Sequence, residues 1–228
     1  MLGDKIFMKN KKLLTILLST MVTFSPVSST HITGPIGKKS KTEPNTTTIF
    51  WEKSKQNNKK STTDINEKKF NNFEEINQFF QKNISKFGLK KGSLKSTKTL
   101  KDEKGKTYYH TIYQIEGIPV YYGRIVFITE KNSTMNSITG RVDTTFENGN
   151  WKNKIKLSEN IAIKKAKNDI KYKNLYKEKA DLYLYNFGGN PYVVYLVDLV
   201  TDTGNWNVFV NAEDGSVINK FNNTPYSD

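Results

Sequence analysis

The chain has 228 residues, with 36 Lys and Arg against 22 Asp and Glu, and a formal net charge of +14. It contains no cysteine, which excludes disulfide bonds, thiolate metal sites and a cysteine nucleophile. Its two histidines are His31 and His110, too far apart for a His-Glu-x-x-His zinc hydrolase, which needs two on one helical face. Arg124 and Arg141 are the only arginines, so nearly all of the basic excess is Lys. Because base readout and bidentate phosphate binding favour Arg, we expect no specific nucleic-acid binding.

Residues 1–29 have the pattern of a secretory signal peptide. A basic segment, Lys9–Lys12, precedes the apolar run Leu13–Phe24, and the small residues of Ser25–Ser29 follow. The apolar run is shorter than the ~20 residues that a membrane span needs. We therefore expect cleavage near Ser29, no transmembrane span in the exported chain, and a secreted or cell-envelope location.

Residues 30–69 are rich in Lys, Thr, Asn and Ser, and their one apolar cluster is Ile49–Trp51. The segment has no sustained periodicity, which predicts a mobile tether. Its positive charge suits weak contact with anionic cell-wall polymers. The aromatic residues concentrate after Phe70, where we expect the folded part to begin.

The folded part begins with an expected helix. Asn72 can cap its N-terminus, with Glu75 completing a capping box, and Gly88 ends it. Apolar residues recur between these limits at helical spacing, which predicts a core-facing stripe. Runs rich in β-branched and aromatic residues predict strands over 94–100, 107–115, 118–129 and 135–142.

The same order of elements repeats after residue 150. Ser158 can cap a second helix, whose apolar face includes Ala162 and Ala166. Strands are predicted over 181–187, 191–201, 205–212 and 216–221, separated by glycine-containing turns. The sequence thus predicts an α+β fold of two small successive units, each a helix packed on an antiparallel sheet.

The residues offer no recognisable catalytic constellation. His110 falls in a strand, where a half-buried structural role is favoured over a triad, because no nucleophile-elbow sequence accompanies it. Asp198 interrupts an apolar strand, which favours an edge position or a structural pair with a Lys. No metal-ligand spacing or phosphate-binding glycine loop stands out, so we expect neither an enzyme nor a cofactor.

Three segments carry a resemblance to a known family. Asp102–Thr107 and Tyr113–Gly123 resemble the fungalysin/thermolysin propeptide (FTP) motif, and Trp206–Val217 resembles the signature of a PepSY domain. Secreted thermolysin-like zinc proteases begin with a signal peptide followed by these two parts in this order. The resemblance implies an FTP-like domain over 70–147, a PepSY-like domain over 154–223 and a tail over 224–228. Because the chain ends at Asp228, about where a catalytic domain would start, it resembles the propeptide without its protease.

The resemblance implies a role in inhibition and folding. Such propeptides assist the folding of the catalytic domain and hold it inactive, so the expected partner is the catalytic domain of a thermolysin-like metalloprotease. An extended segment after the last strand can add main-chain hydrogen bonds in an enzyme's substrate cleft, and a proline restricts the residue before it to extended conformations. The predicted protease-binding residues are Phe221, Asn222, Asn223, Thr224 and Pro225. Two alternatives stay open: a structural or regulatory module of the cell envelope, and the remnant of a truncated protease precursor.

Overall fold

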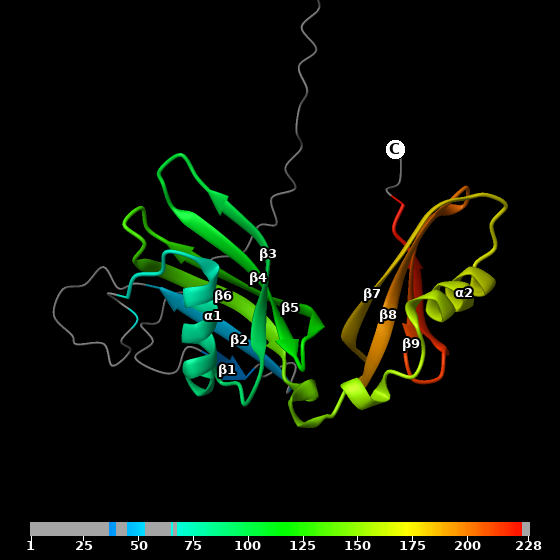
Figure 1. The fold of residues 1–228 in the computed structure, drawn as a ribbon, viewed down its shortest axis with the longest axis horizontal. Coiled ribbons are helices and arrows are strands. Elements are labelled where there is room, and N and C mark those ends of the chain that lie inside the picture. The colour runs from blue at the N-terminus through cyan, green and yellow to red at the C-terminus, as the bar shows by residue number, and fades with distance from the viewer. Residues whose placement is uncertain (1–36, 40–44, 53–64, 66–67, 225–228) are drawn as a thin grey trace, which may run out of the picture. The chain divides into compact units, whose positions relative to one another are not determined.

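Within the residues that it describes, the computed structural model is rich in antiparallel strands and has two α-helices, which confirms the α+β class (Figure 1). It describes residues 37–39, 45–52, 65 and 68–224. The predicted signal peptide and Pro225–Asp228 lie outside the described residues. The strands are β1 (Gly37–Lys39), β2 (Thr46–Glu52), β3 (Ser93–Lys101), β4 (Thr107–Ile115), β5 (Ile118–Thr129), β6 (Met135–Asp143), β7 (Leu175–Phe187), β8 (Asn190–Thr201), β9 (Gly204–Asn211) and β10 (Val217–Asn222). The α-helices are α1 (Phe73–Lys82) and α2 (Glu159–Asp169), and three 3-10 turns are η1 (Ile84–Phe87), η2 (Thr145–Asn148) and η3 (Lys152–Lys154).

Helix α1 begins as predicted. The Asn72 side chain accepts the Glu75 N–H at 3.0 Å, while the Glu75 carboxylate accepts the N–H of Asn71 at 2.9 Å. The α-helix ends at Lys82, earlier than expected, with Asn83 as its C-cap. The chain continues as η1 up to Gly88, whose φ is +73°. A left-handed residue at this position satisfies the last carbonyls of the helix, which explains the glycine.

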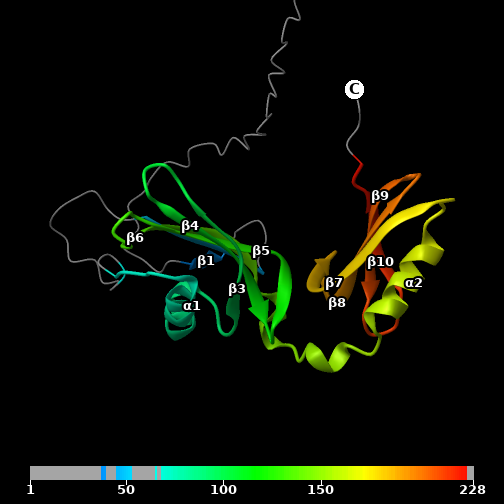
Figure 2. The same cartoon turned by 45° about the horizontal axis from the view of Figure 1, so that its top comes forward.

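Strands β3 to β6 form an antiparallel meander whose bounds confirm the predicted ones within a residue or two. Helix α1 covers one of its faces (Figure 2), and buried aromatic rings fill the space between. Phe80 lies 4.8 Å from Phe87 and 6.3 Å from Tyr113 of β4, measured between ring centroids, and Phe87 lies 6.5 Å from Phe127 of β5. The aromatic stripe of the helix is therefore core, as expected.

Strand β2 corrects the prediction of a tether. Thr46–Glu52 pair with β6 along their whole length, and Ile49 stands opposite Gly140. Ile49 is fully buried, whereas the next side chain, Phe50, is 51% exposed. A run of β-branched and aromatic residues suits a half-buried strand, so its local preference prevails over the Lys-rich composition around it. The tether prediction is wrong for these residues, and most of the remaining residues of 30–69 lie outside the described part.

Helix α2 covers one face of β7 to β10 (Figure 2). Ala162 and Ala166 are buried there against Val197 of β8 and Val208 of β9. Strands β8, β9 and β10 match their predicted ranges within a residue. Strand β7 starts six residues earlier than predicted, at Leu175, because it pairs with the whole length of β8 although its first half is exposed.

The two helix-covered sheets are joined rather than separate. Val120 of β5 pairs with Leu184 of β7 in parallel orientation, and the carbonyl of Ala212 accepts the N–H groups of Lys156 and Leu157 at 2.9 and 3.0 Å. The described residues all belong to one compact unit. The division into two successive domains therefore stays a prediction.

Candidate functional site

The predicted protease-binding segment lies at the edge of the sheet of β7 to β10. Phe221 and Asn222 are the last residues of β10, opposite Asn207 and Trp206 of β9. Asn223 and Thr224 follow the strand, and Pro225 lies outside the described residues. Part of the segment is thus a sheet strand and not a free tail.

Side-chain and backbone hydrogen bonds fasten this segment as far as Thr224. Asn223 donates its N–H to the Asn205 carbonyl at 2.6 Å, and the Asn205 N–H donates to the Thr224 hydroxyl at 2.8 Å. The Asn222 side chain accepts the Thr224 N–H at 2.9 Å and donates to the Thr203 carbonyl at 3.1 Å. The segment is therefore held against the turn between β8 and β9.

Gly204 makes this close approach sterically feasible. Its φ is +130°, and a Cβ atom there would lie 2.3 Å from the Asn222 Nδ2 and 2.6 Å from the Thr224 Oγ1. Only glycine combines this backbone conformation with the absence of a side chain. The sequence shows Gly204 as a turn residue, and its role in holding the C-terminal segment emerges only from the structure.

A cluster of aromatic rings lies on the face of β7 to β9 opposite α2. Tyr121 of β5 lies 5.6 Å from Tyr183, 5.3 Å from Tyr185 and 5.2 Å from Phe209, measured between ring centroids. Tyr185 and Phe209 stack at 4.2 Å, and Phe221 lies 5.9 Å from Phe209. Burial, reinforced by neighbouring hydroxyl groups, holds the pKa of Tyr121 well above its ordinary value. The C-terminal segment therefore borders an aromatic surface through Phe221, whose side chain is 37% exposed.

A bulge in β5 directs Tyr121 into this cluster. Tyr122 has a φ of +65° and is 72% exposed. The backbone of a bulky residue is strained in this region, so the bulge has to be held by its surroundings. At the adjacent Gly123, a Cβ atom would lie 3.0 Å from the Val120 Cβ, which leaves little room for a side chain.

Asp198 lies on a central strand, so the expectation of an edge position is wrong. The Asn207 side chain of β9 donates a hydrogen bond to its carboxylate. Lys179 of β7 stands opposite it in register, although its ammonium is paired with Asp181. Burial raises the pKa of Asp198 above its ordinary value. The amide of Asn207 meets the polar requirement of this half-buried carboxylate, which makes its role structural.

Two glutamates that the sequence did not single out connect distant parts of the chain. Glu147 is 7% exposed and accepts the Lys90 N–H at 2.7 Å, beside the Tyr113 hydroxyl at 3.4 Å. The carboxylate of Glu116 accepts the N–H groups of Trp151 and Lys152 at 2.8 and 3.1 Å. These contacts hold the segment between β6 and α2 against the start of β3 and the β4–β5 turn.

Electrostatics also favour the contacts of the Glu116 carboxylate with Trp151 and Lys152. Burial opposes its ionised form, but the N–H groups of Lys152 and Trp151, together with the Lys91 ammonium at 3.4 Å, outweigh that effect. The pKa of Glu116 therefore lies below its ordinary value. The predicted strands 107–115 and 118–129 leave Glu116 and Gly117 as the turn between them. Local patterns do not predict the partners of Glu116, which lie some 35 residues further on.

The described residues offer no candidate metal site. They contain no cluster of three or more His, Asp or Glu side chains that could hold a metal ion. His110 is half-buried on β4, the position predicted for a strand histidine. None of the described helices has the length and hydropathy that a membrane crossing requires.

Comparison with known proteins identifies two matching family models. Residues 92–142 match the Fungalysin/Thermolysin Propeptide Motif, and residues 156–221 match the Peptidase propeptide and YPEB domain. The chain resembles a thermolysin-like protease propeptide. The matched residues of this propeptide-like chain cover β3 to β6 and α2 to β10, respectively.

The similar proteins are much longer than the matched region. Neutral protease B of Bacillus subtilis is 29% identical over 162 residues, which cover 65% of this chain and 30% of that protein. Bacillolysin of Bacillus cereus is 34% identical over 113 residues, which cover 47% of this chain and 20% of that protein. Among solved structures, the Bacillus megaterium YpeB C-terminal domain has a TM-score of 0.35 at 14% identity, with 79% of this chain and 72% of that chain covered.

Proposed function

We propose that the chain is a secreted, non-catalytic, propeptide-like protein that binds the catalytic domain of a thermolysin-like metalloprotease, inhibits it and assists its folding. The observation that carries this proposal is the presence of both propeptide family matches in one chain, the FTP motif before the PepSY domain. The similarity to Neutral protease B extends over 162 residues and so exceeds either match alone. In this proposal the two matches correspond to domains over 70–147 and 154–223.

The C-terminal segment supplies a mechanism for inhibition. The hydrogen bonds of Asn222, Asn223 and Thr224 hold the segment in one conformation at the sheet edge. Binding a segment that is already ordered costs less conformational entropy than binding a flexible one. Pro225 restricts Thr224 to extended conformations, which suit main-chain hydrogen bonding in a substrate cleft. We propose that Phe221–Thr224 orient the chain at the cleft and that the residues from Thr224 onward enter it.

To assist folding, the chain must present a binding surface that is already folded when the partner begins to fold. The buried aromatic core between α1 and β3–β6 and the alanine face of α2 are complete within the described residues. The sheet surfaces can therefore act as a template for a partner that folds against them. The free energy of binding then stabilises the folded partner by mass action.

Inhibition in trans tests the proposal directly. Mature Neutral protease B of Bacillus subtilis is mixed with the full exported chain, and hydrolysis of a peptide substrate is measured as the chain is titrated to micromolar concentration. We expect saturable inhibition, and a chain shortened to end at Asn222 should bind with less inhibition. In parallel, the denatured catalytic domain is refolded with and without the chain. Neither inhibition nor improved refolding at micromolar chain would refute the proposed function.

A further inference from the structure

The sheet of β2 to β6 has one face covered by α1 and an opposite face that no described helix covers (Figure 1). This second surface is called the open face. Its central side chains come from β3, β4 and β5. They are Lys95, Lys98, His110, Ile112, Arg124 and Val126.

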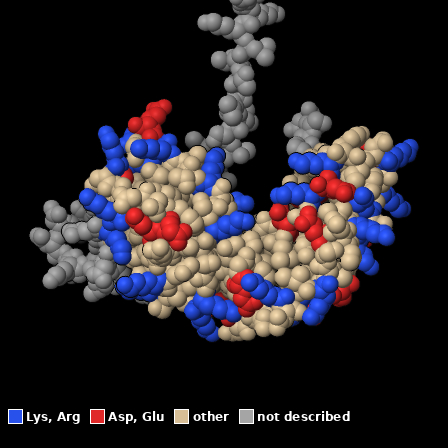
Figure 3. Space-filling model, viewed as in Figure 1, with Lys and Arg blue, Asp and Glu red and all other residues tan. Residues whose placement is uncertain are grey.

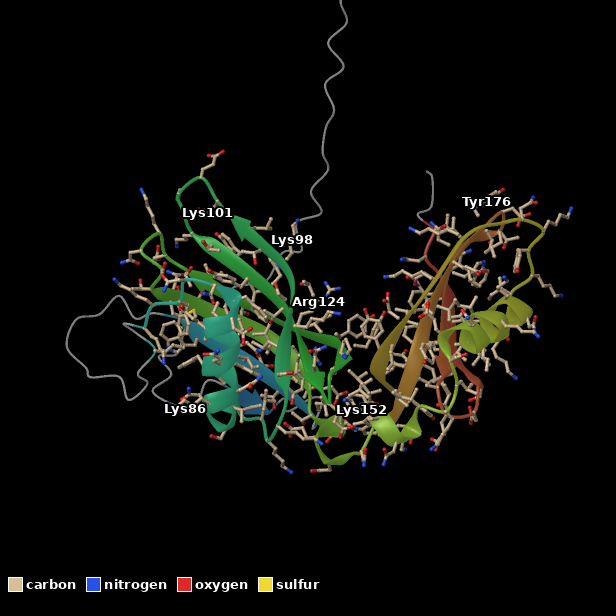
Figure 4. All side chains as sticks on the ribbon, in the orientation of Figure 1. Lys86, Lys98, Lys101, Arg124, Lys152 and Tyr176 are labelled. Atoms are coloured by element: carbon tan, nitrogen blue, oxygen red, sulfur yellow. The ribbon has the colours of Figure 1, made fainter. Side chains whose placement is uncertain are left out.

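Strand register places three cations close together on the open face. Lys95 stands opposite Ile112, which in turn stands opposite Arg124, while Lys98 stands opposite His110 in the next row. Because neighbouring strands lie about 4.8 Å apart, Lys95 and Arg124 project from backbones roughly 10 Å apart. Lys98 and Arg124, both labelled in Figure 4, come from β3 and β5, and β4 lies between these two strands.

A bulge brings Lys98 to the same face as Lys95. Residues three apart in a regular strand point to opposite faces, but the register of β3 shifts between Ser96 and Lys98, which leaves Thr97 without an opposite residue. The Thr97 hydroxyl donates to the His110 carbonyl at 3.0 Å and so holds the bulge in place. The irregularity thus adds a second lysine to this surface.

These cations have no ion-pair partner among the described residues. Other basic side chains do, since Lys91, Lys106 and Lys167 pair with Glu116, Glu130 and Glu178. The three side chains, Lys95, Lys98 and Arg124, are exposed. In the described part of the chain, no Asp or Glu carboxylate lies close enough to form an ion pair with any of them. The face therefore presents uncompensated positive charge.

Apolar side chains lie between the cations. Ile112 and Val126 are half-buried, and Leu100 and Phe50, at the margin, are 41% and 51% exposed. Apolar residues together with arginine are typical of protein interfaces. Binding of a phosphate polymer depends mainly on cations that neutralise its phosphates. Because Ile112 and Val126 interrupt the cations of the open face, a protein partner is favoured. Figure 3 shows basic atoms interspersed with acidic and neutral ones on the side of the molecule that it draws.

We propose that the open face docks on an acidic surface of the partner protein, with carboxylates opposite Lys95, Lys98 and Arg124 and apolar side chains against Ile112 and Val126. The inference rests on the proposed function, because the partner is the same protease catalytic domain. The C-terminal segment would then provide inhibition, and the open face would provide a second, charge-steered contact. Charge complementarity of this kind acts mainly on the association rate and on its dependence on salt.

Charge reversal with a matched control tests the proposal. The double variant K98E/R124E is compared with K164E/K171E, which makes the same change in net charge at two exposed lysines on and just after α2. Association with mature Neutral protease B is measured by surface plasmon resonance at low and at high salt. We expect K98E/R124E to lower the association rate roughly tenfold at about 0.05 M salt and the control to lower it less than twofold. The difference should disappear at about 0.5 M salt, where surface charges are screened.

The possible outcomes separate this inference from the proposed function. If the unsubstituted chain fails to bind the protease, the proposed function fails and this inference with it. If the chain binds, and K98E/R124E associates as fast as the control pair, only the inference is refuted. Loss of binding to purified cell-wall polymer by K98E/R124E, with protease binding unchanged, would also refute it. Thermal unfolding of each variant checks the fold, and K98Q/R124Q, which removes charge without reversing it, should give an intermediate rate.

Discussion

Replacing Ile49 with Ala tests whether β2 belongs to the core. Ile49 is fully buried on the side of β2 that faces the core of α1 and β3–β6. The substitution removes three carbon atoms, at about 0.8 kcal/mol of transfer free energy each. The cavity left in a packed core adds to this cost, so we expect a loss of about 3 kcal/mol of unfolding free energy.

Phe50 provides the matched control. It is the next residue on the same strand, its side chain points to the opposite face, and it is 51% exposed. Phe50→Ala removes more carbon than Ile49→Ala, yet we expect a loss of less than about 1 kcal/mol, because surface substitutions leave no cavity. A much larger loss of unfolding free energy for Ile49→Ala than for Phe50→Ala therefore shows that Ile49 faces the core and Phe50 faces solvent.

Urea unfolding followed by tryptophan fluorescence measures both losses, since Trp51 and Trp151 pack in or against this core. If 46–52 were a tether, both substitutions would leave the unfolding midpoint unchanged. Equal small losses for Ile49→Ala and Phe50→Ala would thus refute the placement of β2 in the sheet.

Two further substitutions test contacts of the candidate site. Gly204→Ala should destabilise the chain by about 1–3 kcal/mol, because the new Cβ would meet the Asn222 side chain. Hydrogen exchange at the amides of Asn205 and Asn223 should become faster. Gly117→Ala is the control for backbone strain alone, since Gly117 has a φ of +80° and a Cβ there would meet nothing within 4 Å. Similar exchange at Asn223 in both variants would contradict the role of Gly204. The pKa of Glu116 is lower in the folded chain than its ordinary value of 4.5, so its ionised form stabilises the fold above that pH, and the contribution is lost as the pH falls through the folded-state pKa. Glu116→Gln should therefore reduce stability at pH 7 and converge with the unsubstituted chain once the pH falls below the folded-state pKa, as measured by pH-dependent urea unfolding. A constant difference between the two chains from pH 7 down through that range would contradict the assignment.

Local patterns predicted most of the elements correctly. The cap at Asn72 and the aromatic stripe placed α1, and the glycine turns placed the strand ends of β8 and β9, because each signal acts over a few residues. Strand β2 was not predicted, because the Lys-, Thr-, Asn- and Ser-rich residues on both sides of it dominate the composition of 30–69. The start of β7 was missed because its exposed charged residues, Lys177–Lys179, hide the alternation that marks a strand.

Contacts between distant residues could not be predicted in the same way. The pairing of Val120 with Leu184, the hydrogen bond from Asn207 to Asp198 and the contacts of Glu116 with Trp151 depend on the completed topology. The sequence predicts residues 221–225 as a protease-binding segment, and that role stays a prediction. The sequence could not show that hydrogen bonds to Thr203 and Asn205 hold this segment as far as Thr224.

The position of β2 imposes an order on folding. Roughly ninety residues separate Ile49 from Gly140, its partner on β6, so this strand is synthesised early but must wait for β6 before it can pair. Until the two strands pair, each of them leaves an edge unprotected, and such edges invite pairing with other chains. A nascent chain halted before β6 would therefore carry Ile49–Trp51 as an unburied apolar segment, available to chaperones and to aggregation alike.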